Sequence, residues 1–141
     1  MPRRSRAREV ALQALYQREV NPDTIAENQE RFLTARLRSP PLVAFSKSLL
    51  EGVSRYREEI DALLDARSEN WRVARMASTD RAILRIAAFE LLHTDVPGAV
   101  AVDEAIELAK RYGTDASSKF VAGILGRMLA DRTVAAESAG I

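Results

Sequence analysis

Apolar residues recur every three or four positions along most of the chain, a spacing that predicts amphipathic α-helices. The first helix is expected from about Arg4 to Val20, and its apolar stripe consists of Ala7, Val10, Ala11, Ala14 and Leu15. The same spacing predicts helices over 24–37, 42–56, 58–66, 82–92, 101–113 and 116–130, with a short one over 68–76. No segment shows the alternation typical of a strand. The predicted fold class is therefore all-α, with about seven helices.

The segment from Ala82 to Leu92 is apolar on nearly every side, and its only polar residues are Arg85 and Glu90. A helix of this kind must be covered on most of its sides. We therefore expect it to be the central helix around which the others pack. Ser78, Thr79 and Asp80 precede it and are predicted to cap its first turn.

The positions of three glycines predict how helices end and pack. Gly113 is the last residue of the helix predicted over 101–113, at the place where a left-handed residue often ends a helix. Gly123 and Gly126 lie inside the last predicted helix, where each costs roughly 1 kcal/mol relative to alanine. Such glycines are expected to let another helix pack closely.

One compact domain is expected over residues 1–141, because no flexible linker interrupts the predicted helices. Ser39-Pro40-Pro41 marks a firm helix boundary. The predicted division is an N-terminal helical half over about 1–77 and a C-terminal bundle over about 78–132. The small and polar tail, 133–141, is expected to be frayed.

Composition excludes several classes of site. The chain has 141 residues, 47% of them hydrophobic, which is enough for a true core. It has no cysteine, which excludes disulfides and thiol catalysis, and its single histidine, His93, excludes a histidine-rich zinc site. No apolar run approaches the roughly 18–20 residues that span a bilayer, and the N-terminus lacks the apolar region of a secretory signal. We expect a cytoplasmic protein with no membrane segment, metal or cofactor.

Positive charge is concentrated at the N-terminus although the net charge is only +1. Arg3, Arg4, Arg6 and Arg8 precede the first acidic residue, Glu9. On a helix Arg4 and Arg8 share a face, and cations in a first turn are unfavourable for the helix dipole unless an anion binds there. Guanidinium groups suit phosphate and stack on bases. The cluster predicts binding of RNA or DNA, and the alternative is a solvated helix start.

A second group of residues surrounds the turn between the last two predicted helices. Tyr112 ends one helix, and Lys119 and Phe120 lie in the first turns of the next. Two aromatic rings, a lysine and free backbone amides can hold single-stranded nucleic acid by stacking and phosphate contact. The alternative is that both rings belong to the core, because helical spacing groups Phe120 with Ile124.

Catalytic chemistry is not expected. Asp103 and Glu107 share a helix face, but Arg111 follows Glu107 by four residues, which is typical of an ion-paired surface. The chain has no Walker-type phosphate loop, nucleophile elbow or dinucleotide fingerprint. The interpretation is a protein that is not an enzyme.

Several separated motifs, in order, resemble the NusB transcription antitermination family. They are RAREVALQALY at 6–16, DRAILRIA at 80–87, DVP at 95–97 followed by EAIELAK at 104–110, and KFVAGIL at 119–125. The resemblance covers nearly the whole chain. It implies an all-helical fold of two small bundles.

The resemblance also implies a function. It implies binding of boxA-type single-stranded RNA in ribosomal RNA transcripts together with the ribosomal small-subunit protein NusE, within the transcription elongation complex. By position, the implied RNA contacts are Arg4, Arg6, Arg8, Tyr112, Lys119 and Phe120. Tyr16 and Asp80 match positions that face the protein partner.

Two departures from the family pattern and two alternatives stand beside this interpretation. The family often has asparagine where this chain has Asp103 and Ala122, so RNA affinity is in question at those positions. One alternative is a helical scaffold, such as a homodimer, that binds no nucleic acid. The other is the RNA-binding module of a ribosomal RNA methyltransferase, because a related module forms the front part of some of these enzymes.

Overall fold

The computed structural model describes residues 3–22, 26–69 and 71–138, and the side chains of all of these except 26–27 and 133–138. These residues form seven α-helices and one short 3₁₀ helix and no strand, which confirms the all-α prediction. The helices are α1 (Arg3–Val20), α2 (Ala26–Leu37), α3 (Pro40–Arg55), α4 (Arg57–Arg67), α5 (Ser78–His93), α6 (Gly98–Tyr112) and α7 (Ser117–Ser138), with the 3₁₀ helix at Val73–Arg75.

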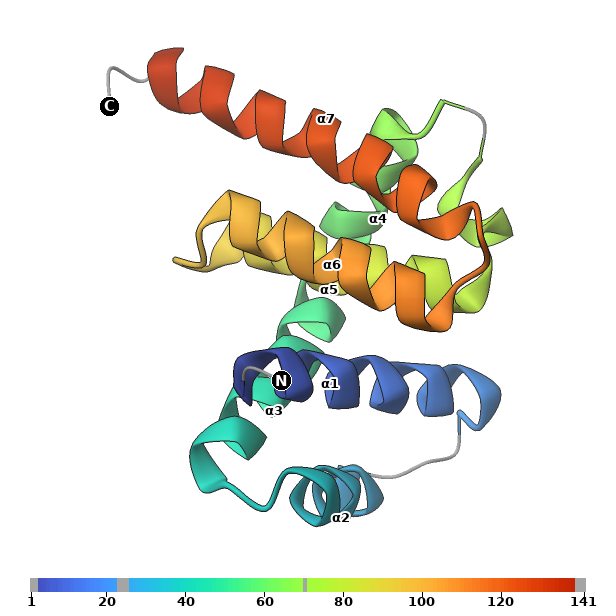
Figure 1. Cartoon of the computed structure of the whole chain (residues 1–141), viewed down its shortest axis with the longest axis vertical. Coiled ribbons are helices and arrows are strands. Elements are labelled where there is room, and N and C mark those ends of the chain that lie inside the picture. Colours follow the sequence, from blue (N-terminus) through green and yellow to red (C-terminus); the bar gives the residue numbers. More distant parts are fainter. Residues whose placement is uncertain (1–2, 23–25, 70, 139–141) are drawn as a thin grey trace.

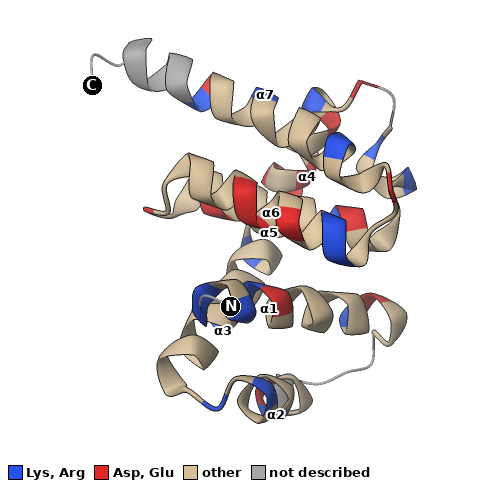
Figure 2. Cartoon of the chain, viewed as in Figure 1, with Lys and Arg blue, Asp and Glu red and all other residues tan. Residues whose placement is uncertain are grey.

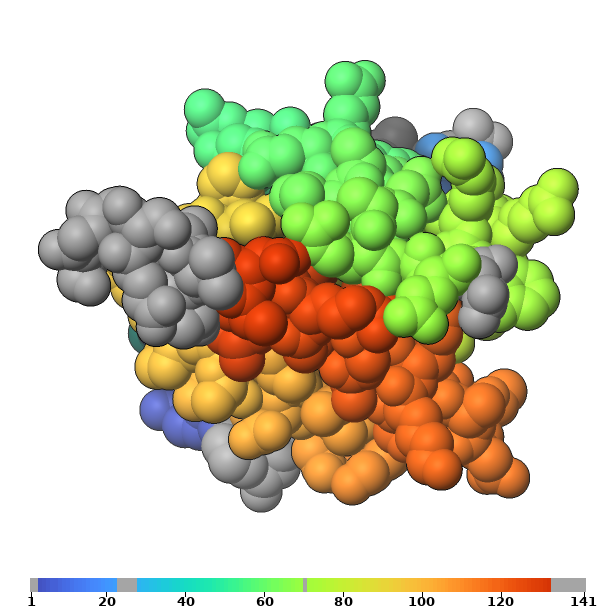
Figure 3. Space-filling model, turned by 90° about the horizontal axis from the view of Figure 1, so that it is seen from above, coloured from blue at the N-terminus to red at the C-terminus, as the bar shows by residue number. Residues whose placement is uncertain are grey.

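Two bundles lie on top of each other (Figure 1). Helices α1, α2 and α3 pack against one another in the first bundle, and α4, α5, α6 and α7 form the second. On the outer face of the second bundle, α7 lies between α4 and α6 (Figure 3). Because α4 packs against α5 and α7, the second bundle begins at Arg57, well before the boundary near 78 that the sequence suggested.

Helix α5 is the central helix, as its apolar sequence predicted. Every residue from Ala82 to Leu91 is buried, and α5 contacts α1, α3, α4, α6 and α7. Its buried Arg85 is neutralised by Asp61 of α4 through two hydrogen bonds of 2.9 Å. The pairing removes the cost of placing an unpaired guanidinium in the core.

The start of α5 differs from the prediction. The helix already begins at Ser78, so Ala77 occupies the N-cap and no side chain caps the first turn. Ser78, Thr79 and Asp80 therefore lie within the first turn instead of before it. Asp80 is still favourable there because a carboxylate near a helix N-terminus interacts well with the dipole.

The glycines also differ from the prediction. Gly113 has φ −93°, which is not left-handed, and it is required because a Cβ there would lie 2.4 Å from the Ser117 side chain. The expected close helix packing at Gly126 is wrong, since a Cβ there would meet nothing within 4 Å. At Gly123 a Cβ would meet only the Arg127 side chain, at 3.6 Å. Tight contacts between helices lie at two other glycines: a Cβ at Gly52 would come within 2.2 Å of the Phe89 ring, and a Cβ at Gly98 within 2.3 Å of the Leu129 side chain.

The C-terminal end of the chain is more helical than expected. Helix α7 continues to Ser138, past the predicted end near Ala130 and through most of the tail that the sequence predicted to be frayed. Residues 139–141 lie outside the described part of the chain. None of the helices that the structure describes combines the length and apolar character needed to cross a membrane.

Candidate nucleic-acid interface

The arginine-rich start of α1 lies over an aromatic ring of α3. The guanidinium carbons of Arg4 and Arg8 are 4.5 Å and 5.2 Å from the centroid of the Phe45 ring. Arg4 and Arg8 therefore share a helix face, as their spacing predicted. Arg4 is exposed and remains available to a ligand.

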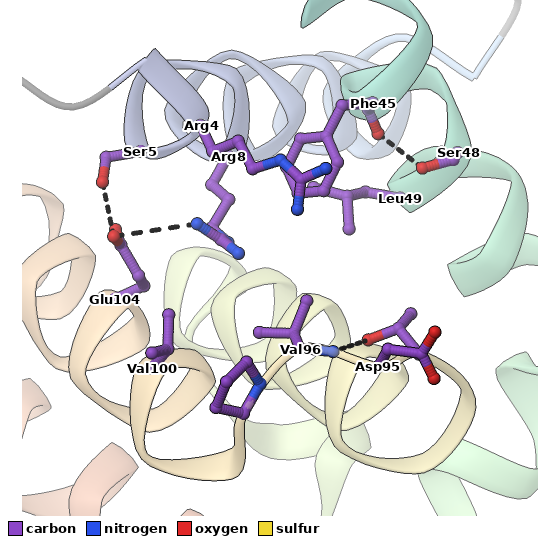
Figure 4. Close-up of a pocket in the computed structure, with 12 residues that line it drawn as sticks. Arg4, Ser5, Arg8, Phe45, Ser48, Leu49, Asp95, Val96, Val100 and Glu104 are labelled. Carbon is purple, nitrogen blue, oxygen red and sulfur yellow. Dashed lines mark hydrogen bonds and ion pairs between the residues drawn. The ribbon is translucent and has the colours of Figure 1, made fainter.

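Arg8 has a different environment from the other arginines at the start of α1. It is buried and donates two hydrogen bonds of 2.8 Å to the carboxylate of Glu90, which is also buried. A second carboxylate, that of Glu104, lies 3.7 Å from Arg8 (Figure 4). Burial acts to lower the pKa of Arg8, but hydrogen bonding to Glu90 and attraction to both carboxylates outweigh it and raise the pKa. The guanidinium of Arg8 therefore joins α1 to α5 inside the protein, and contact of Arg8 with RNA stays a prediction.

Arg6 belongs to a cluster that joins α1 to the end of α6. The two oxygens of the Glu9 carboxylate each accept a hydrogen bond, one from Arg6 and one from Arg111. Beside this pair, Gln13 donates a hydrogen bond of 3.1 Å to the hydroxyl of Tyr112. We call these five residues the Glu9 cluster.

Glu9 is charged in this cluster. Its side chain is only 5% exposed, and burial by itself raises the pKa of a carboxyl. Hydrogen bonds from Arg6, Tyr112 and Arg111 act in the opposite direction and dominate, so the pKa of Glu9 is lowered. Burial and the neighbouring Glu9 charge raise the pKa of Tyr112, so this phenol is neutral at physiological pH.

The predicted aromatic corner is divided between two environments. Tyr112 is exposed and contacts α1, whereas Phe120 is half-buried and packs against the core. Within the described part of the chain these two rings do not stack on each other. Lys119 is exposed beside Phe120. The turn between α6 and α7 is held by Ser117, whose hydroxyl accepts a hydrogen bond of 2.9 Å from the Thr114 amide.

A hollow of about 510 Å³ opens between α1, α3 and the segment before α6 (Figure 4). Arg4 and Phe45 form one wall, Val96 and Val100 form another, and Glu104 lies between them. The hollow is therefore lined by two guanidinium groups that lie over the Phe45 ring, by apolar side chains and by the Glu104 carboxylate.

The two residues expected to face a protein partner lie on adjoining segments. Tyr16 is exposed near the end of α1, and Asp80 is half-buried in the first turn of α5. Glu19 and Arg81 form an ion pair that ties these two segments together. The buried Oδ1 atom of Asp80 has no hydrogen-bond partner among the described residues.

Sequence reasoning missed the roles of Glu9 and Arg111. It paired Arg111 with Glu107 on one helix face, but in the structure Glu107 pairs with Lys110 at 3.5 Å and Arg111 reaches across to α1. One signal was available: Glu9 lies among buried apolar residues of α1, and a buried carboxylate needs a cationic partner.

Within the described part of the chain, no group of histidine, aspartate and glutamate side chains could hold a metal ion. Figure 2 shows how the basic and acidic residues are distributed over the helices. Basic residues gather at the start of α1 and at the end of α6, and acidic residues follow the middle of α6. Of these basic residues, Arg6 at the start of α1 and Arg111 at the end of α6 meet at the Glu9 carboxylate.

Comparisons with known proteins agree with the helical arrangement. The family model described as the NusB family matches residues 5–130. The transcription antitermination protein NusB of Anaeromyxobacter dehalogenans is 45% identical over 127 residues, which cover 89% of this chain and 89% of that protein. The Bacillus subtilis protein of the same name is 40% identical over 130 residues, which cover 92% and 96%. These relatives are named as transcription antitermination proteins and not as enzymes.

A solved structure leads to the same family. T. maritima NusB superposes with a TM-score of 0.78 at 38% identity, and the match covers 90% of this chain and 89% of that one. Since the family model and these relatives extend over nearly the whole sequence, the chain belongs to the NusB family.

Proposed function

We propose that this protein is a transcription antitermination factor that binds boxA-type single-stranded RNA of ribosomal RNA transcripts together with the ribosomal small-subunit protein NusE. It acts in the cytoplasm, within the transcription elongation complex, by binding and not by catalysis. Family membership supports the class of function. A structure described as antitermination factors NusB and NusE in complex with dsRNA shares the fold, with a TM-score of 0.78 at 24% identity.

The observation that carries the proposal is the meeting of the N-terminal arginines with Tyr112. These residues are far apart in the sequence, yet Arg6 and Tyr112 belong to one cluster through Glu9 and Gln13. Accessible guanidinium groups beside an exposed ring provide phosphate contact and base stacking on the same surface.

The proposed RNA surface consists of accessible side chains on α1, α6 and α7, with Arg8 supporting it from inside. Its members are Arg4, Arg6, Tyr112, Lys119 and the exposed part of Phe120. Tyr16 and Asp80 form the proposed contact with NusE, because they lie on segments joined by the Glu19–Arg81 ion pair.

An electrophoretic mobility shift with boxA-type RNA tests the proposal, with the chain alone and with NusE added. We expect a shifted complex with boxA-type RNA, a weaker one with a scrambled RNA of equal length, and tighter binding when NusE is present. An Arg4→Ala variant should weaken the shift because it removes an accessible cation. If boxA-type RNA does not shift in either arm, the proposal is refuted.

A further inference from the structure

We propose that Arg111 is an additional RNA contact in this protein, and that Glu9 holds it beside Arg6 to form a clamp for one backbone phosphate. This inference rests on the proposed RNA-binding function and extends it to two residues with no assigned role. The clamp joins the first turns of α1, which carry Arg6 and Glu9, to the last turn of α6, which carries Arg111.

The charges of the clamp favour an anion. A single carboxylate faces two guanidinium groups, so the three side chains together keep one positive charge. Glu9 is 5% exposed, whereas Arg6 and Arg111 are 40% and 54% exposed. The negative charge is therefore covered while both positive groups reach solvent.

Hydrogen-bonding capacity also remains. A guanidinium carries five N–H donors, and within the described part of the chain Arg6 and Arg111 each form one side-chain hydrogen bond, to Glu9. The remaining donors of both groups are free for phosphate oxygens. Because Glu9 already orients both guanidinium groups, less side-chain freedom is lost when a phosphate binds.

Space for a nucleotide adjoins the clamp. Arg111 lines a hollow of about 770 Å³ whose floor includes Val100 and Leu108. Asp103, Glu104 and Glu107 lie along the same hollow and repel phosphate, whereas Lys110 lines it together with Arg111. The three carboxylates restrict a phosphate to the part of the hollow that the two cations line, and leave the rest to a base or ribose.

The test is a fluorescence anisotropy titration of labelled boxA-type RNA with the full chain, alone and with NusE, at several salt concentrations. Arg111→Ala should weaken binding about tenfold and make the logarithmic salt slope shallower by about 0.7. The matched control is Arg57→Ala on α4, a helix that carries no residue of the proposed RNA surface. It removes the same charge from an arginine whose side chain is 61% exposed and pairs with Asp61 at 3.9 Å. Arg57→Ala should change affinity by less than about twofold.

Glu9→Gln separates positioning from overall charge. The variant makes the protein more positive, so charge alone predicts tighter RNA binding, whereas loss of the clamp geometry predicts weaker binding. We expect weaker binding, with an unchanged helical circular dichroism spectrum showing that the variant is folded. Tighter binding by Glu9→Gln, or equal effects of Arg111→Ala and Arg57→Ala, would overturn the clamp while leaving RNA binding intact. If the unaltered chain binds no RNA in either arm, the proposed function and the clamp fail together.

Discussion

The pairing of Arg8 with Glu90 gives a direct test of how the two bundles are joined. Both side chains are almost fully buried, with exposures of 4% and 1%, and two hydrogen bonds of 2.8 Å connect them. An Arg8→Ala substitution removes both bonds and leaves the Glu90 carboxylate in the core without its cation. Breaking a buried ion pair in this way costs about 3–5 kcal/mol.

For a domain of this size each kcal/mol lowers the melting temperature by about 3 °C, so Arg8→Ala should lower it by roughly 10–15 °C. The measurement is urea and thermal unfolding followed by circular dichroism. The control is the double variant Arg8→Met with Glu90→Leu, which removes both charges and keeps the volume. It should recover most of the lost stability, because apolar replacement of a whole buried pair is often neutral.

Two results would refute this reasoning. A loss below about 1 kcal/mol for Arg8→Ala would mean that the pair behaves like an exposed one. A double variant as unstable as the single one would mean that the unpaired carboxylate is not the cause. RNA binding adds a third measurement: the folded double variant should keep its RNA affinity, and a tenfold loss would return Arg8 to the RNA surface.

Four further predictions follow from the structure. Gly52→Ala should destabilise the protein by about 1–3 kcal/mol in urea unfolding, because the added methyl group would overlap the Phe89 ring, and an unchanged midpoint would contradict the close contact. Glu9 has a lowered pKa when folded, since hydrogen bonds outweigh its burial; its stabilising effect is therefore present above its ordinary value of about 4.5 and is lost as pH falls through the folded pKa. The difference in unfolding free energy between the unaltered chain and Glu9→Gln should accordingly shrink from pH 7 to pH 3, and a constant difference would refute it. Phe120→Ala should weaken RNA binding by about 1–3 kcal/mol in an anisotropy titration, and a lowered melting temperature with no separate RNA defect would assign the ring to the core alone. Asp103→Asn should tighten RNA binding about twofold by removing an exposed negative charge near the RNA surface, and weaker binding would show that the carboxylate is a contact.

The helices were predictable because burial imposes a spacing of three to four residues on each of them. The central position of α5 followed from its apolar sequence, and the structure surrounds it with five other helices. Details of helix ends were less predictable, since they depend on close contacts. Gly113 is an example: its requirement comes from the nearby Ser117 side chain and not from its own backbone angle.

The candidate site was predictable in composition but not in pairing. Spacing placed Arg4 and Arg8 on one face and could not say which would be buried, because the partner of Arg8 lies 82 residues away on another helix. The same applies to Arg111, whose partner Glu9 is 102 residues distant. Local periodicity contains no information about such contacts, whereas an unpaired acid in an apolar helix at least indicates that a distant cation is required.

Helix α5 has neighbours in both bundles, so neither bundle retains a complete interior when the other opens. Backbone amides of α5 should therefore exchange with deuterium only through global unfolding, with one common free energy of opening. The molecule should melt in a single cooperative transition despite its two-layered shape. An RNA or protein ligand that touches only one layer would then stabilise both.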